Sequence, residues 1–278
     1  MNSDSGDLDR ITIEVEECRG LGLEVMAPDI NESFVRFAVV PGTNKIRFGL
    51  GAVKNIGAEI AEAIIRERKA NDKYDSLENF LERVQSKNLN KKSLESLIKC
   101  GAMDCFGERG AMLANVQKML DFNREVKDIK NKISGSLFGA GTVSLSRPTL
   151  KMEIAEPVDP KQKLLWEKEL LGLYLSAHPF AQSLPLVKDL VVPSDELQNH
   201  KDNSWVTVAG VVAAIKQIRT KKNELMCFVT LEDLKSPFEI LVFPSVLEKT
   251  KELWKEDKTL IISGRLSFKD GQPKVLAG

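Results

Sequence analysis

One stretch decides how the helical half of the chain is interpreted: Leu50-Gly51-Ala52-Val53-Lys54-Asn55-Ile56-Gly57-Ala58-Glu59-Ile60-Ala61-Glu62-Ala63-Ile64. Apolar residues lead into a short turn that ends at Gly57, and alanine and isoleucine then recur at helical spacing. Gly57 allows the backbone to turn tightly and to approach a ligand closely. The next helix directs the unpaired N–H groups of its first turn forward, where they favour a phosphate, and Lys54 adds a cation beside the same place.

The spacing is similar to the helix-hairpin-helix pattern, which indicates duplex DNA binding through Lys54, Asn55, Ile56 and Gly57. Contacts of this kind go to phosphates, so binding would be independent of base sequence and sensitive to salt. The alternative is an ordinary glycine-containing turn between two packed helices.

A weaker second copy follows about 50 residues later. A helix over 91–99 leads into the turn 100–107, and the next helix opens at Arg109. We expect Gly101, Gly107 and Arg109 to contact duplex DNA there. Lys91 and Lys92 fit a phosphate contact and a solvated helix start equally well.

The remaining elements of the first 204 residues follow from periodicity, glycine and proline. The sequence predicts a helix over 8–22, two short strands over 34–40 and 45–48, and helices over 58–70, 76–85, 91–99, 109–130 and 161–174. Residues 133–160 are rich in small residues and have weak periodicity, which is typical of a linker.

From Trp205 onward the pattern becomes that of β-structure. β-branched and aromatic residues fill 205–218, 225–231, 238–243 and 260–268, and a helix over 246–254 separates two of these strands. This order is the layout of the OB-fold, a five-stranded barrel. A last strand would begin just before Gly278, so we expect it to be cut short. The fold class is therefore α+β, with a helical tandem helix-hairpin-helix domain followed by a small OB-fold barrel.

The segment 216–223 between the first two barrel strands carries four cations, Lys216, Arg219, Lys221 and Lys222, and no acid. OB-folds often hold single strands with this loop, which predicts a single-stranded DNA contact. A solvated hairpin tip is the alternative. Aromatic residues are scarce, and the four phenylalanines 228, 238, 243 and 268 fit a barrel core at least as well as a base-stacking surface.

The amino-acid composition excludes several classes of protein. The 278 residues are 42% hydrophobic and 29% charged, which excludes a disordered chain. No apolar run approaches the roughly 20 residues that span a bilayer, and Met1–Asp9 carries three aspartates and no cation, unlike a secretory signal. We therefore expect a cytoplasmic protein without a membrane partner. The net charge is zero, but 42–132 holds 18 cations against 13 acids and 205–278 holds 12 against 9, which favours two basic modules.

No catalytic or metal-ligating group is predicted. Four separated cysteines and two histidines do not make a zinc site, and neither G-x-x-x-x-G-K-[ST] nor G-x-S-x-G occurs. His178 precedes a proline at a helix end, where capping or packing is expected. Asp7 and Asp9 lie in an acidic terminus with no strand to hold them.

Several blocks, in this order, resemble the bacterial DNA polymerase III alpha subunit family. They are the runs 28–33 (Pro-Asp-Ile-Asn-Glu-Ser), 46–57, 97–104 with Arg109, 169–179 (Glu-Leu-Leu-Gly-Leu-Tyr-Leu-Ser-Ala-His-Pro) and 262–268. The resemblance covers nearly the whole chain. It implies the end of the fingers region over 1–48, a helix-hairpin-helix domain over 49–132, a linker with a clamp-binding peptide over 133–160, a connecting helical segment over 161–204 and an OB domain over 205–278.

The resemblance also implies a role in template-directed DNA synthesis, with duplex and single-stranded DNA, a sliding clamp and other replicase subunits as partners. The family's palm aspartates, which hold two Mg²⁺ ions, have no counterpart here. We therefore expect no cofactor in this chain and no polymerase activity from it alone.

The clamp peptide of the family falls at Ser134–Phe138. Leu137 and Phe138 match its two apolar residues, while Ser134 replaces the usual leading glutamine, so we expect weaker clamp binding than a glutamine-led peptide gives. Packing of Leu137 and Phe138 on the chain's own helices is the alternative. A free-standing DNA-binding accessory protein, without a polymerase partner, is the alternative for the function as a whole.

Overall fold

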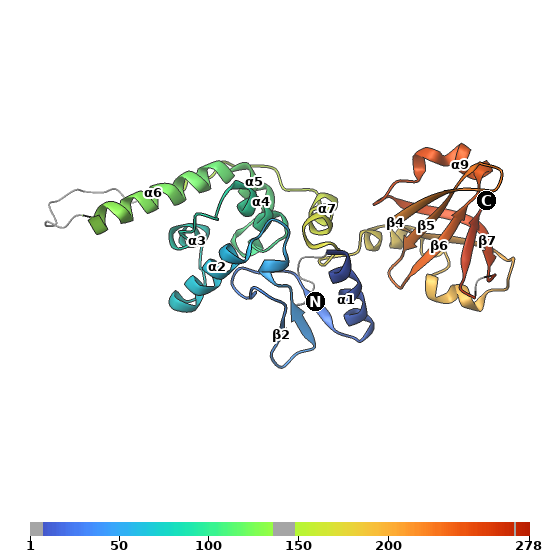
Figure 1. Cartoon of the computed structure of the whole chain (residues 1–278), viewed down its shortest axis with the longest axis horizontal. Coiled ribbons are helices and arrows are strands. Elements are labelled where there is room, and N and C mark those ends of the chain that lie inside the picture. Colours follow the sequence, from blue (N-terminus) through green and yellow to red (C-terminus); the bar gives the residue numbers. More distant parts are fainter. Residues whose placement is uncertain (1–7, 136–147, 270) are drawn as a thin grey trace. The chain divides into compact units, whose positions relative to one another are not determined.

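The structure is a computed structural model that describes residues 8–135, 148–269 and 271–278 (Figure 1). It divides into two compact units, Met1–Ser176 and Ala177–Gly278. The division falls inside the segment 161–204: residues 161–176, which include the helix, belong to the first unit, and 177–204 belong to the second. Among the described residues no helix is both long enough and apolar enough to cross a membrane.

The first unit combines helices with a small three-stranded sheet of order β1-β3-β2, in which β1 is parallel and β2 antiparallel to β3. Strand β1 was not predicted, because three residues are too few to show an alternating pattern. The elements are α1 (Leu8–Gly20), β1 (Glu24–Met26), β2 (Ala38–Val40), β3 (Lys45–Arg47), η1 (Leu50–Ala52), α2 (Ala58–Asn71), α3 (Leu77–Arg83), α4 (Lys91–Lys99), η2 (Asp104–Phe106), α5 (Arg109–Ala114), α6 (Val116–Gly135) and α7 (Pro160–Leu171).

The helix predicted over 109–130 is two helices, broken at Asn115. Its buried side-chain amide donates to the carbonyl of Glu153 (2.9 Å) and accepts from the Glu153 amide (2.8 Å). These bonds hold part of the predicted linker against the helices. Helix α6 also continues to Gly135, inside the segment predicted as linker.

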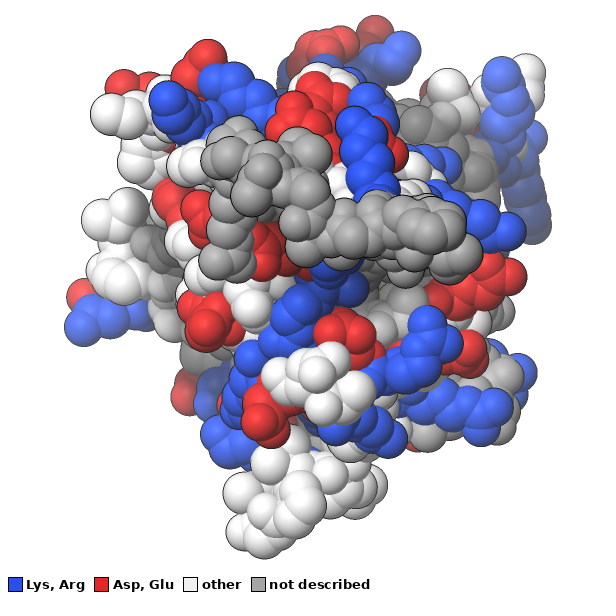
Figure 2. Space-filling model, turned by 90° about the vertical axis from the view of Figure 1, so that its left-hand side faces the viewer, with Lys and Arg blue, Asp and Glu red and all other residues white. Residues whose placement is uncertain are grey.

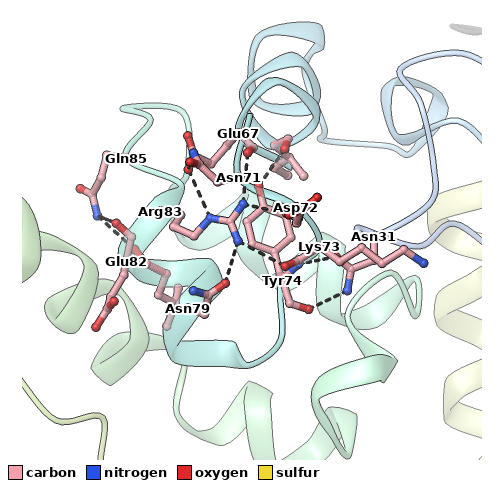
Figure 3. Close-up of polar contacts among 12 residues, drawn as sticks. Asn31, Glu67, Asn71, Asp72, Lys73, Tyr74, Asn79, Glu82, Arg83 and Gln85 are labelled. Carbon is pink, nitrogen blue, oxygen red and sulfur yellow. Dashed lines mark hydrogen bonds and ion pairs between the residues drawn. The ribbon is translucent and has the colours of Figure 1, made fainter. Parts of the chain in front are cut away.

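A half-buried arginine joins α2 to α3 (Figure 3). The Arg83 guanidinium lies 4.5 Å from the centre of the Tyr74 ring and pairs with Glu67 at 3.2 Å. It also donates to the backbone carbonyls of Glu67 (3.1 Å) and Asp72 (2.8 Å). Carbonyls at a helix C-terminus lack intrahelical partners, so Arg83 satisfies the end of α2 and positions α3 beneath it.

The second unit is a closed barrel of order β4-β5-β6-β8-β7, which confirms the α+β class and the OB-type layout. Strand β8, expected to be cut short, has four residues, yet it pairs in parallel with β6 and antiparallel with β7 and thereby closes the barrel. The elements are η3 (Pro179–Gln182), α8 (Leu184–Val187), η4 (Ser194–Asn199), β4 (Trp205–Arg219), β5 (Leu225–Glu232), β6 (Pro237–Val242), α9 (Pro244–Thr250), η5 (Lys251–Leu253), β7 (Thr259–Ser267) and β8 (Lys274–Ala277).

Alternate residues of the barrel strands face inward, as strand geometry requires. Cys227, Val229 and Leu231 of β5 are fully buried, and Phe238 of β6 joins them in the core. Phe238 is thus a core residue rather than a base-stacking one, whereas Phe243 keeps 40% of its surface exposed.

Candidate nucleic-acid interface

The first corner, Val53–Gly57, lies between η1 and α2 and is held by its apolar residues. Val53 and Ile56 are buried, while Lys54, Asn55 and Gly57 are exposed. The tight turn is made by Asn55 (φ 69°), not by Gly57 (φ −73°), so the predicted role of Gly57 in turning the chain is wrong. Asparagine is among the few residues other than glycine that adopt the left-handed conformation readily. The Asn55 side chain donates to Ser96 Oγ (3.2 Å), which ties the corner to α4.

Gly57 instead leaves space in front of α2. A Cβ at this position would meet no atom within 4 Å, so a ligand can reach the backbone. Two amides of the corner are used internally: Lys54 N–H donates to Leu170 O (2.9 Å) and Ile56 N–H to Val53 O (3.0 Å). The available donors are those of the first turn of α2, which, in the part of the chain that the structure describes, has no side-chain cap.

The second corner differs because its cation is buried. Arg109 is 5% exposed, and its guanidinium binds both carboxylate oxygens of Asp104 (2.7 and 2.8 Å) and donates to Lys99 O (2.9 Å). Glu167 Oε1 lies 3.5 Å from the same group. Gly101 (φ +85°) is also buried, and a Cβ there would run into the Arg109 guanidinium. We therefore assign Arg109 and Gly101 to the fold rather than to a DNA contact; Gly107 is exposed with open space around it and stays a prediction.

Glu108 occupies the position that a phosphate would take at the start of α5. Its carboxylate accepts from the amides of Gly110 and Ala111, and it also pairs with Lys163 Nζ (2.9 Å) and Val158 N–H (3.1 Å). Burial alone would raise the Glu108 pKa, but these hydrogen bonds lower the pKa to about 2. The backbone amides at the second corner thus bind the Glu108 carboxylate, while those of the first turn of α2 at the first corner remain available to a ligand.

This cap predicts an acid-sensitive contribution to stability. Because the folded pKa of Glu108 lies below the unfolded value of about 4.3, its contribution is present above that pH and is lost as the pH falls toward about 2. We expect the unfolding temperature of Glu108→Gln to be lower than wild type at neutral pH and to converge with it at acid pH. A pH-independent difference between the two, measured by calorimetry, would contradict the assignment.

The predicted single-strand contacts lie on the β4–β5 hairpin, and all four are exposed. Strand β4 runs through Lys216 to Arg219, so these two point to opposite faces, since they are three residues apart. Arg219 donates to the carbonyl of Asn223 (3.1 Å), whose left-handed backbone makes the turn. Lys221 and Lys222 form the tip. The cations therefore do not make one cluster, and Lys216 faces the same side as Phe228.

Charge of one sign does not dominate the face drawn in Figure 2, where described lysines and arginines lie among aspartates and glutamates. Leu137 and Phe138 lie outside the described residues. Within those residues, no group of three or more His, Cys, Asp or Glu side chains is arranged to hold a metal ion.

Sequence reasoning named Asn55 only as a DNA contact and missed its role in making the turn, and it missed Glu108 altogether. The tolerance of asparagine for positive φ could have located the turn. Glutamate is not among the favoured helix-capping residues, so nothing in the sequence marked Glu108.

Comparison with known proteins agrees with this architecture. A helix-hairpin-helix motif model matches residues 22–112, and a model of an OB-fold nucleic acid binding domain matches residues 206–278. The DNA polymerase III subunit alpha of Borreliella burgdorferi is 34% identical over 266 residues, covering 94% of this chain and 23% of that protein. The corresponding subunits of Aquifex aeolicus and Thermus aquaticus are each 32% identical, covering 91% and 98% of this chain.

The chain spans between a fifth and a quarter of the length of these relatives, with 20% of the Aquifex and 22% of the Thermus protein covered. The matches run through both units, from the first corner to the barrel. The chain belongs to the DNA polymerase III alpha subunit family and corresponds to a segment that carries its helix-hairpin-helix region and OB-fold barrel.

Proposed function

We propose that this chain is the DNA-binding and clamp-docking segment of a replicative DNA polymerase. One observation carries the proposal: the uncapped first turn of α2, at an exposed corner with Lys54, inside the range that matches the helix-hairpin-helix motif. Backbone N–H groups at a helix N-terminus, joined by a lysine, suit a phosphate of duplex DNA.

The other parts have complementary roles in this proposal. The hairpin cations Lys216, Arg219, Lys221 and Lys222 bind single-stranded template from two sides of the β4–β5 tip. Leu137 and Phe138 dock into a sliding clamp, which raises the effective concentration of the enzyme at DNA. Synthesis itself, with its Mg²⁺ ions, and contacts to other replicase subunits belong to the complete polymerase in the cytoplasm.

Reversing the charge at the first corner tests the duplex site. We expect Lys54→Glu to weaken duplex binding about tenfold at moderate salt and to reduce the slope of log affinity against log salt by about one. The measurement is a fluorescence anisotropy titration of a labelled duplex at several salt concentrations. The side chain of Lys54 is exposed, so its replacement leaves the buried contacts of the corner in place.

Lys127→Glu, an equal charge change on the exposed side of α6, is the matched control and should change affinity little. Equal losses of duplex affinity in the two variants would contradict a defined site at the corner. An affinity that does not change with salt concentration would contradict it too. An open reading frame upstream of the Met1 codon that encodes a palm domain would separate a polymerase segment from a free-standing accessory protein.

A further inference from the structure

The outer face of strands β4 and β7 carries a row of cross-strand pairs on the side opposite the barrel core. Residues directly opposite in an antiparallel pair have Cβ atoms about 4.5–5.5 Å apart, and every second pair shares a face. The row consists of Trp205 with Arg265, Thr207 with Ser263, and Ala209 with Ile261. It contains an aromatic ring, a cation and two hydroxyls, and no acid.

One end of this row is covered and the other is open. Ala209 is 3% exposed because Phe180 and its neighbours pack on it. Trp205, at the other end, keeps 59% of its surface exposed. The ring edge of Trp205 is placed close to the backbone of Gly278, where a Cβ would lie 2.8 Å from the indole Cη2. The indole is thus supported at one edge while much of its surface faces solvent.

Arg265 lies opposite Trp205 on the neighbouring strand, and its guanidinium is available to an anionic ligand. It is exposed, and no carboxylate of the described residues lies within ion-pair distance of it. The adjacent pair, Thr207 and Ser263, joins its hydroxyls at 2.9 Å and adds polar groups along the row. An open aromatic surface beside an unneutralised guanidinium suits a ligand that is both aromatic and anionic.

We propose that Trp205 and Arg265 form a single-stranded DNA subsite, in which one base stacks on the indole and a neighbouring phosphate binds the guanidinium. The subsite lies on the β4–β7 pair, whereas the hairpin cations lie on the far end of the β4–β5 pair and on its turn, so the two would bind different nucleotides of one strand. This inference rests on the proposed single-strand role of the barrel and identifies a further place of contact.

The indole itself reports on the site. The chain has three tryptophans, so Trp166→Phe with Trp254→Phe leaves Trp205 as the sole emitter. In a titration of this variant of the 278-residue chain with an oligothymidylate, we expect Trp205 emission to be quenched with the same midpoint as the anisotropy of the labelled oligonucleotide. Trp205→Ala should weaken binding at least about fivefold, and Trp205→Phe should retain part of it. Arg265→Gln should weaken binding and lower the salt slope by about 0.7.

Ile261→Ala, on the same face two pairs away, is the control and should leave affinity unchanged. If the oligonucleotide binds but neither Trp205 emission nor the affinity of Trp205→Ala and Trp205→Phe changes, the subsite is wrong while the proposed function stands. If wild type binds no single strand at all, the barrel's proposed role fails with it. Thermal melting of each variant distinguishes a lost DNA contact from a lost fold. The quenching experiment keeps Trp205 in place, so its result does not depend on any substitution at that position.

Discussion

Replacement of Arg109 by methionine is expected to lower the free energy of unfolding of the first unit by about 3–5 kcal/mol. Glu167 is 1% exposed and would keep its charge in the interior without its cation. The carbonyl of Lys99 would lose a donor at the same time. Oε2 of Glu167 would keep its hydrogen bonds from Leu175 and Ser176, but Oε1, which has no hydrogen-bond partner of its own in the described residues, would lose the nearby cation. Breaking one side of a buried ion pair is costly because the remaining charge cannot reach water. Chemical denaturation followed by circular dichroism measures the loss.

Arg109→Lys distinguishes a structural arginine from a DNA-binding one. Lysine keeps the charge but cannot reproduce the bidentate contact with Asp104, so we expect Arg109→Lys to destabilise the first unit clearly as well. Lys91→Ala, which removes an exposed pair with Glu95 on α4, is the control and should have little effect on stability. A fully stable Arg109→Lys protein with weakened duplex binding would restore Arg109 to the DNA interface.

The second large effect is expected at Gly264, where Gly264→Ala should destabilise the barrel by about 2–3 kcal/mol. A Cβ at this position would overlap the carbonyl oxygen of Leu276 and lie 2.9 Å from both its carbonyl carbon and Val275 Cγ1. These atoms belong to β8, which joins β6 to β7 and closes the barrel. Backbone cannot move aside as a flexible side chain would, so the strands must separate.

Gly57→Ala is the matched glycine control. Its backbone is extended and its added Cβ meets nothing within 4 Å, so no loss of stability is expected. Differential scanning calorimetry of both variants provides the comparison. A Gly264→Ala protein that melts like wild type would show that β7 and β8 are not as closely packed as the structure has them.

The sequence alone determined the features that depend on neighbours along the chain. The helix over 91–99 is preceded by Asn90, whose side chain and that of Ser93 cap each other's backbone amides, and its predicted bounds agree with those in the structure. The barrel order followed from β-branched runs separated by turns, because strand periodicity and turn chemistry are local properties. The exposed corner at Lys54 was likewise visible in the sequence.

Tertiary structure decided which polar residues remain available to a ligand. Lys54 and Arg109 are both cations at glycine-containing corners. Glu167, 58 residues further along the chain, pairs with Arg109, whereas no carboxylate of the described residues pairs with Lys54. The sequence does not show whether the Trp205 side chain faces the barrel core or the solvent. The barrel places it on the outer face, opposite Arg265. Whether a cationic side chain can bind a ligand depends on the carboxylates and the burial that distant segments contribute. The periodicity of the sequence does not indicate which distant segments come into contact.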